Sequence, residues 1–189
     1  PITSVAVTDP LPAGLTWGST TVTWPSAPTT TVLDDFETTG SWAGGSGWSA
    51  GSWTEVDDGG LGDAAGRIRK DNNLTSRRLH FRPSSLVGEG VSRVAGNFSA
   101  AGTVTLTFDK RCALLEADDA VVVQVRPNGA AVWTTIATYS GCNDAAFVGQ
   151  SFTLSAATFG AATEIRAQVS SLFETGDDMY LDNVKFVAS

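Results

Sequence analysis

Hydrophobic and polar residues alternate with a period of two along much of the chain from residue 104 onward, which is the pattern of strands with one buried face. The segment VTLTF at 104–108 places its valine, leucine and phenylalanine on one face and its threonines on the other. The segment EIRAQV at 164–169 directs Arg166 and Gln168 away from three apolar residues. Comparable runs occur at 120–125, 132–138, 151–154 and 179–187. Because helical periodicity is nearly absent, the sequence predicts an all-β fold, an antiparallel two-sheet β-sandwich.

Turn-forming residues separate these runs. The segment RPNG at 126–129 has the Asn-Gly pair that supplies the positive φ angles of a hairpin turn. Residues 40–60 (GSWAGGSGWSAGSWTEVDDGG) are rich in glycine, and ordering glycine is entropically costly. We therefore expect an irregular loop there, whose tryptophans either plug the end of the sandwich or form a stacking surface.

Two further alternating segments, at 2–7 and 15–24, precede a Thr/Pro-rich stretch at 28–31 that is typical of an extended linker. We divide the chain into an N-terminal β arm with its linker, residues 1–31, and a β-sandwich, residues 32–189. An arm ahead of a complete sandwich needs backbone partners. It can add a hairpin to its own sheet, complete the sheet of a neighbouring subunit, or be the remnant of an upstream domain. Its apolar residues are Ile2, Val5, Val7, Leu15, Trp17, Val22 and Trp24.

The composition narrows the choice of partners. The net charge of −8 argues against binding to nucleic acid or to an anionic membrane, which would need a basic patch, and it is compatible with calcium. No run of about 18 apolar residues occurs, so we expect no membrane insertion. The scarcity of lysine and the abundance of Gly, Ser, Thr, Ala and Val are typical of a secreted or cell-surface β protein.

Two cysteines, Cys112 and Cys142, fall in or beside separate predicted strands. Their spacing fits no zinc site. An even number of cysteines in a chain of extracellular character favours a disulfide, and two buried free thiols are the alternative.

From residue 32 the chain reads VLDDFE, a Trp/Gly-rich loop, LTFDKR, DDAVVVQVRPNGAAVWTTIATYSG and GDDMYLDNVKF. This order resembles the jelly-roll modules appended to bacterial secreted proteases and surface proteins, which are related in architecture to MAM-type and carbohydrate-binding jelly rolls. The acidic first strand and the last strand, YLDNV at 180–184, are the most specific elements of the resemblance. It implies a sandwich of jelly-roll type.

The acidic residues of these two strands suggest a structural calcium site. Asp35 and Glu37 share one face of the first strand of the sandwich, and Asp182 lies in the last. The first and last strands of a jelly roll are neighbours, so the three carboxylates can converge on a hard cation. The resemblance implies that such modules often hold calcium there. Alternatively, these acids are solvated charges that discourage pairing at a sheet edge.

Catalytic signatures are missing. The single histidine, His80, is flanked by arginines, and nearby positive charge disfavours its protonated form. No nucleophile elbow, zinc-protease motif or phosphate-binding loop occurs. We therefore do not expect an enzyme.

Exposed aromatic rings would allow the sandwich to bind glycans. We expect Trp42 and Trp48 to be the better exposed aromatic residues, assisted by Arg67, Arg69 and Asn72. Trp53 and Trp133 are further candidates, but each begins or lies within a predicted strand and can instead be a core residue. The sequons at Asn73 and Asn97 could instead carry sugar themselves if the host glycosylates them.

Two functional hypotheses follow. Residues 7–15 (VTDPLPAGL) resemble a bacterial surface repeat domain with the motif V-x-D-x-L-P-x-G-L. The first hypothesis is an extracellular, non-catalytic structural or adhesive subunit that self-associates, even into filaments, by donating its arm as a strand. The alternative is a carbohydrate-binding module of a larger secreted enzyme or adhesin.

Overall fold

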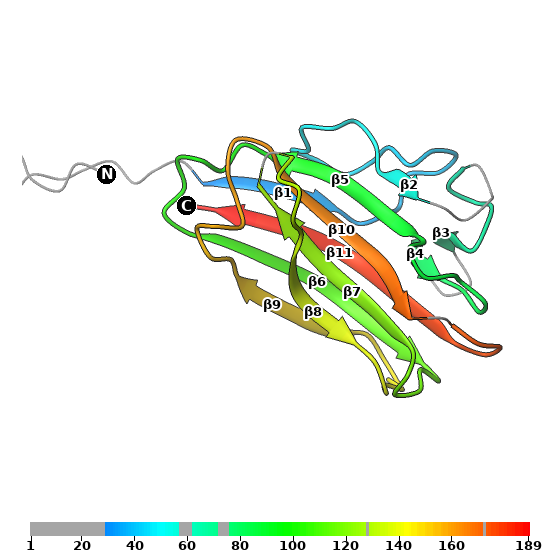
Figure 1. Cartoon of the computed structure of the whole chain (residues 1–189). Coiled ribbons are helices and arrows are strands. Elements are labelled where there is room, and N and C mark those ends of the chain that lie inside the picture. The colour runs from blue at the N-terminus through cyan, green and yellow to red at the C-terminus, as the bar shows by residue number, and fades with distance from the viewer. Residues whose placement is uncertain (1–28, 57–61, 72–75, 128, 172) are drawn as a thin grey trace, which may run out of the picture.

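The computed structural model describes residues 29–56, 62–71, 76–127, 129–171 and 173–189. This part of the chain contains eleven strands and no helix, so it has no helix that could cross a membrane (Figure 1). The strands are β1 (Thr30–Asp34), β2 (Thr54–Val56), β3 (Ile68–Asp71), β4 (Arg78–Phe81), β5 (Gly90–Gly96), β6 (Val104–Ala113), β7 (Ala120–Arg126), β8 (Thr134–Tyr139), β9 (Val148–Thr153), β10 (Thr163–Ser171) and β11 (Asp178–Ala188).

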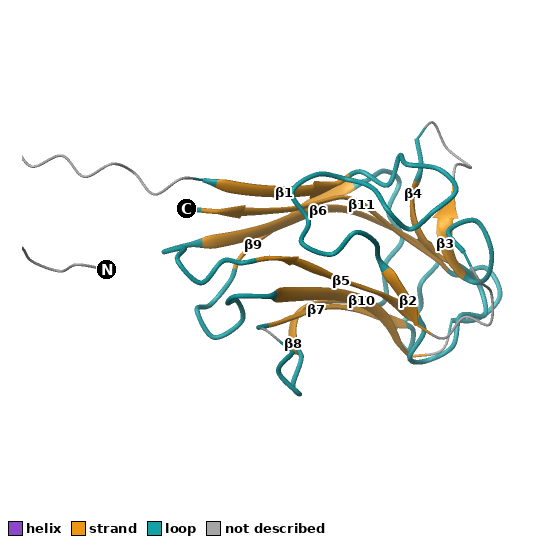
Figure 2. Ribbon diagram, turned by 90° about the horizontal axis from the view of Figure 1, so that it is seen from above, coloured by secondary structure: helices purple, strands orange, loops and turns teal. Residues whose placement is uncertain are grey.

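The strands form two antiparallel sheets. The first, here called the β11 sheet, has the order β3-β4-β11-β6-β9, and β1 also pairs with β11. The second, the β10 sheet, has the order β2-β5-β10-β7-β8. Seen from above, the two sheets lie face to face as two layers (Figure 2). The predicted all-β, two-sheet β-sandwich is confirmed.

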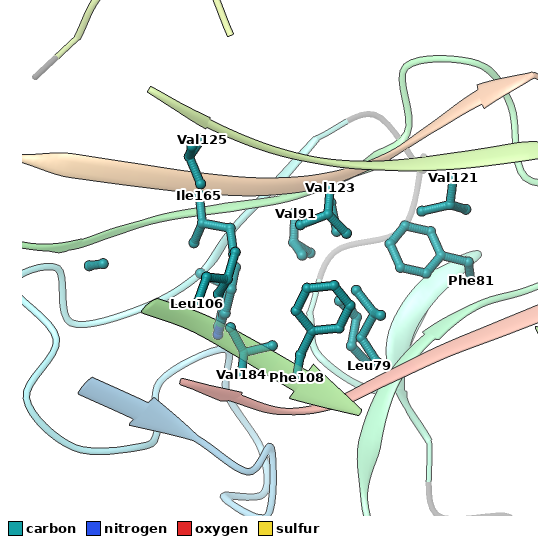
Figure 3. Close-up of a cluster of buried hydrophobic side chains, with 14 of the residues drawn as sticks. Leu79, Phe81, Val91, Leu106, Phe108, Val121, Val123, Val125, Ile165 and Val184 are labelled. Carbon is teal, nitrogen blue, oxygen red and sulfur yellow. The ribbon is translucent and has the colours of Figure 1, made fainter. Parts of the chain in front are cut away.

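The core lies between the sheets because the strands alternate buried and open positions as the sequence pattern predicts. In β6, every second residue from Val104 to Cys112 is buried. Figure 3 shows the two layers of side chains that meet. The β11 sheet supplies Leu79, Phe81, Leu106, Phe108 and Val184, and the β10 sheet and its neighbours supply Val91, Val121, Val123, Val125 and Ile165.

Cys112 and Cys142 form a disulfide, as predicted. It joins the end of β6 to the loop that follows β8, and it closes a segment of 30 residues. Cys112 is fully buried in the core cluster. The disulfide therefore connects strands of the two sheets through the core.

The glycine-rich loop of residues 38–53 covers the open edge of β1. The backbones of Leu33 and Ser46 exchange two hydrogen bonds, at 3.0 and 2.7 Å. Gly45 and Gly47 have φ angles of 71° and 77°, and a Cβ atom would lie 2.1 Å from the Leu33 carbonyl oxygen at the first and 2.4 Å from that of Thr31 at the second. Glycine is therefore required for this loop to approach β1 so closely.

Candidate functional site

The outward side of the β10 sheet carries a row of polar side chains that crosses all five strands. In the strand register, Thr54 pairs with Ser92, Ser92 with Arg166, Arg166 with Gln124, and Gln124 with Thr135. Each of the three inner members alternates with buried residues of its own strand, so its side chain points away from the core. The alternation that builds the core therefore also assembles a continuous polar surface.

Hydrogen bonds fix this row. The Nε atom of Arg166 donates to Oε1 of Gln124 at 2.6 Å, and Nε2 of Gln124 donates to Oγ1 of Thr135 at 2.9 Å. Next to them, Nε and Nη2 of Arg126 both contact Oε2 of Glu164 at 2.7 Å. The two guanidinium groups are thus held flat along neighbouring strands.

Trp133 lies over these two arginines. Its ring centroid is 4.3 Å from the guanidinium carbon of Arg126 and 4.5 Å from that of Arg166, which are cation–π distances. The indole is half-buried. Beside it is an open cavity of about 210 Å³ whose lining includes Ser92 and Gln168. This surface combines an aromatic face with hydroxyl, amide and guanidinium groups.

The tryptophans are placed only in part as the sequence pattern suggested. Trp133, for which a glycan site and a core position were both open, stands on the outer face of the β10 sheet. Trp42 is 8% exposed, so the expectation that it is exposed is wrong, and Trp48 is half-buried, as Trp133 is. The Nε1 atom of Trp42 donates to Oε2 of Glu55, and that of Trp48 donates to the Leu33 carbonyl, each at 2.9 Å. Trp53 belongs to the core.

Arg67 and Arg69, two other predicted glycan-binding residues, do not lie in this surface. Arg67 forms an ion pair with Glu89 at 3.2 Å, and Arg69 forms one with Asp71 at 2.7 Å, at β3 of the other sheet. Asn72 lies outside the described residues. A ligand-binding role for these three residues stays a prediction.

The predicted calcium ligands lie where β1 ends and within β11. Asp35 and Glu37 are exposed on either side of the buried Phe36, and Asp182 is 9% exposed. Burial raises the pKa of Asp182 to about 6, and the nearby carboxylates of Glu37 and Asp109 act in the same direction. Among the described residues, the carboxylates within 4.8 Å of one another are a different set, Glu116, Asp119 and Asp177. Calcium binding stays a prediction.

The ammonium group of Lys70 lies inside the loop that follows Asp35 and Glu37. The Nζ atom of Lys70 donates to the carbonyl oxygens of Thr38, Ser41 and Ala43, at 3.0, 2.8 and 3.2 Å. Lys70 is 2% exposed, and burial lowers its pKa. The ammonium group therefore holds the carbonyls of this loop much as a bound cation would.

His80 is buried between two carboxylates. Its Nδ1 atom is 3.0 Å from Asp71 and its Nε2 atom 2.6 Å from Asp178, while Tyr180 stacks on the ring. Each ring nitrogen therefore lies within hydrogen-bond distance of a carboxylate oxygen, and the expectation drawn from the flanking arginines stays a prediction. The ring is 3% exposed, which closes it to a substrate.

All seven residues predicted for assembly (Ile2, Val5, Val7, Leu15, Trp17, Val22 and Trp24) lie outside the described residues. Strand donation by this arm, and the resemblance of residues 7–15 to a surface repeat, stay predictions.

No protein-family model and no curated protein matches the chain. Solved structures do match. The K1 cleaved adhesin domain of Lys-gingipain from Porphyromonas gingivalis W83 has a TM-score of 0.54 at 18% identity, over 85% of this chain and 99% of that one. A family 61 carbohydrate-binding module in complex with β-1,4-galactotriose has a TM-score of 0.50 at 12% identity, over 72% and 88% of the two chains.

A family 29 carbohydrate-binding module from Piromyces equi also has a TM-score of 0.50, at 11% identity, over 87% and 93% of the two chains. At these identities the matches show the fold. The chain has the jelly-roll β-sandwich fold that carbohydrate-binding modules and a gingipain adhesin domain share, and the predicted jelly-roll type is confirmed.

Proposed function

We propose that the chain is a non-catalytic, extracellular carbohydrate-binding domain that binds saccharides on the outer face of its β10 sheet. The observation that carries the proposal is Trp133, half-exposed beside an open cavity and next to the polar row of Ser92, Arg166 and Gln124. Sugar rings stack their C–H faces on aromatic rings, while amide, hydroxyl and guanidinium groups bond their hydroxyls. Both kinds of contact are available on this one face.

The similar folds support this reading, since one of those structures is a carbohydrate-binding module with a bound galactotriose. Among the described residues, the charged ones that line the cavity are Arg126 and Arg166. Glycoside hydrolysis needs a pair of carboxyl groups across the scissile bond, and the described lining residues include no carboxylate. The Cys112–Cys142 disulfide is typical of proteins exported to an oxidising compartment.

A glycan array followed by titration calorimetry tests the proposal. Trp133→Ala should weaken binding about tenfold or more, because a central tryptophan typically supplies a large share of binding energy. Val132→Ala is the matched control, since Val132 is 75% exposed and adjacent in sequence. If no glycan binds, or if Trp133→Ala binds as tightly as the unchanged protein, the proposal is wrong.

A second proposal is the structural or adhesive subunit that self-associates through its N-terminal arm, stabilised by calcium at Asp35, Glu37 and Asp182. The arm precedes β1 in the sequence, and the glycine-rich loop covers the edge of β1 that β11 leaves open. In the described part of the chain, β3 and β9 end the order of the β11 sheet, and β2 and β8 end that of the β10 sheet. An edge strand is where added strands pair. The match to an adhesin domain is compatible with this function.

A further inference from the structure

The two arginines beneath Trp133 differ in the partners that bind their positively charged guanidinium groups. Arg126 has its Nε and Nη2 atoms on Glu164 and its Nη1 atom on the carbonyl of Ala130, 3.0 Å away. Arg166 donates through Nε to the neutral amide of Gln124. Among the described residues, no carboxylate pairs with Arg166, and its two terminal amino groups have no hydrogen-bond acceptor.

This arrangement is electrostatically unfavourable in the empty protein. Arg166 is half-buried, and burial together with repulsion from Arg126 lowers its pKa. Arginine nevertheless stays charged at all ordinary pH values. A partly desolvated guanidinium without a counter-charge is costly, and the Trp133 ring and the Gln124 amide are neutral, so an anion at this position would add the counter-charge that no described residue supplies.

The local charge of the site contrasts with that of the whole chain. The described residues that line the cavity carry two positive charges, and Glu164 neutralises that of Arg126. The chain as a whole has a net charge of −8. An excess of positive charge on this face of an acidic protein is therefore specific to the site, and at physiological ionic strength distant acids are screened beyond about 8 Å.

We infer that the ligand of this face is an acidic saccharide, one with a uronic acid whose carboxylate pairs with the Nη1 and Nη2 atoms of Arg166. The inference rests on the proposed carbohydrate-binding function and adds the class of sugar. The planar guanidinium presents two parallel N–H donors, from Nη1 and Nη2, that match the two oxygens of a carboxylate. The hydrogen bond from Nε to Gln124 fixes the direction in which this pair of donors points. The sugar ring then lies beside Trp133, with Gln168 and Ser92 within the same cavity.

The experiment compares polygalacturonate, alginate and glucuronan with the carboxyl-reduced form of each, which keeps the linkage and loses the charge. Binding is measured by affinity electrophoresis and calorimetry in buffer with EDTA, which removes calcium cross-links. The unchanged protein should bind at least one acidic polymer at least about tenfold more tightly than its reduced form, because a charged hydrogen-bonded pair is replaced by a neutral hydroxyl.

Arg166→Gln should abolish that preference, and Arg166→Lys should restore only part of it, because lysine keeps the charge without the fork. Arg111→Gln, on the outer face of the β11 sheet, is the matched control and should keep the full preference. The comparison of acidic and reduced polymers uses the unchanged protein, so it does not depend on how well a variant folds.

Three results are distinguishable. Preference for an acidic polymer that is lost in Arg166→Gln supports the inference. Equal binding of the acidic and reduced polymers, with loss in Trp133→Ala, overturns the inference and leaves the carbohydrate-binding function standing. The absence of binding to these polymers and to every neutral glycan of an array overturns both.

Discussion

At the scale of single residues, Asp182 is the clearest case of a carboxyl group whose ionisation destabilises the folded protein. Its carboxyl is almost fully buried, and the pKa is raised from 3.8 to about 6, chiefly by burial. The folded protein holds this proton more tightly than the unfolded chain, so unfolding releases it between about pH 4 and pH 6. This residue therefore makes stability fall as the pH rises through that window.

Asp182→Asn should remove this pH dependence and stabilise the protein at pH 7 by about 1 to 3 kcal/mol, with no gain at pH 4. Asparagine keeps an oxygen for the Asn183 backbone N–H, which now lies 2.8 Å from Oδ1 of Asp182. Urea unfolding from pH 4 to pH 7 in EDTA measures the effect. Asp35→Asn is the control, because Asp35 is exposed and should leave the pH dependence unchanged.

The same variant tests the calcium hypothesis. If Asp35, Glu37 and Asp182 hold calcium, the unchanged protein will melt at a higher temperature in calcium than in EDTA, and Asp182→Asn will lose that difference. A melting temperature that calcium does not alter would contradict the calcium site.

The tryptophans show which residue placements a sequence cannot supply. Trp133 sits in the strand-like run AVWTTIAT, which left a core position open for it, but it precedes an edge strand with little burial of its own. Trp42 and Trp48 have only small residues around them, namely glycine, serine and alanine, which suggested exposure. Their burial depends on Glu55 and Leu33, partners 13 and 15 residues away. No local pattern records such contacts.

At the scale of elements, most strands with clean alternation were predictable, whereas β2, β3, β4 and β5 were not predicted. β6, β7 and β10 alternate cleanly between buried and half-buried residues, so their segments were recognised. β3 (IRKD) and β4 (RLHF) are four residues long and carry charged side chains at buried positions. Such side chains are tolerated at buried positions because residues elsewhere in the chain bond to them. For example, the carboxylates of Asp71 and Asp178 lie within hydrogen-bond distance of His80.

The contacts of Lys70 in β3 predict that this residue stabilises the loop of residues 38–53. Lys70→Met keeps the aliphatic stem and removes the buried ammonium group that donates to three carbonyl oxygens of the loop. We expect a loss of about 2 to 4 kcal/mol in the free energy of unfolding. We also expect faster hydrogen exchange of the backbone amides of residues 38–53.

Lys185→Met is the matched control, since Lys185 faces outward on β11. It should leave both measurements nearly unchanged. If the backbone amides of residues 38–53 exchange hydrogen in Lys70→Met at the same rate as in the unchanged protein, Lys70 does not hold the loop.

At the scale of the whole molecule, the described residues form a two-sheet sandwich with a core of its own. The eleven described strands fall between Thr30 and Ala188, and so does the core cluster, from Val32 to Ala188. We therefore expect a chain of residues 29–189 to fold with a melting temperature close to that of the full chain. The strand β1 keeps its pairing with β11 in this shorter chain.

The self-association hypothesis predicts a different outcome for assembly. The full chain should form concentration-dependent oligomers in sedimentation velocity, and the chain of residues 29–189 should stay monomeric, because it lacks the segment that would pair with a neighbouring sheet. Val22→Pro in the full chain is the sharper variant, since proline removes one backbone donor and blocks strand pairing while the length is kept. A full chain that is monomeric at every concentration, or a shortened chain that forms the same oligomers, would leave glycan binding as the function to pursue.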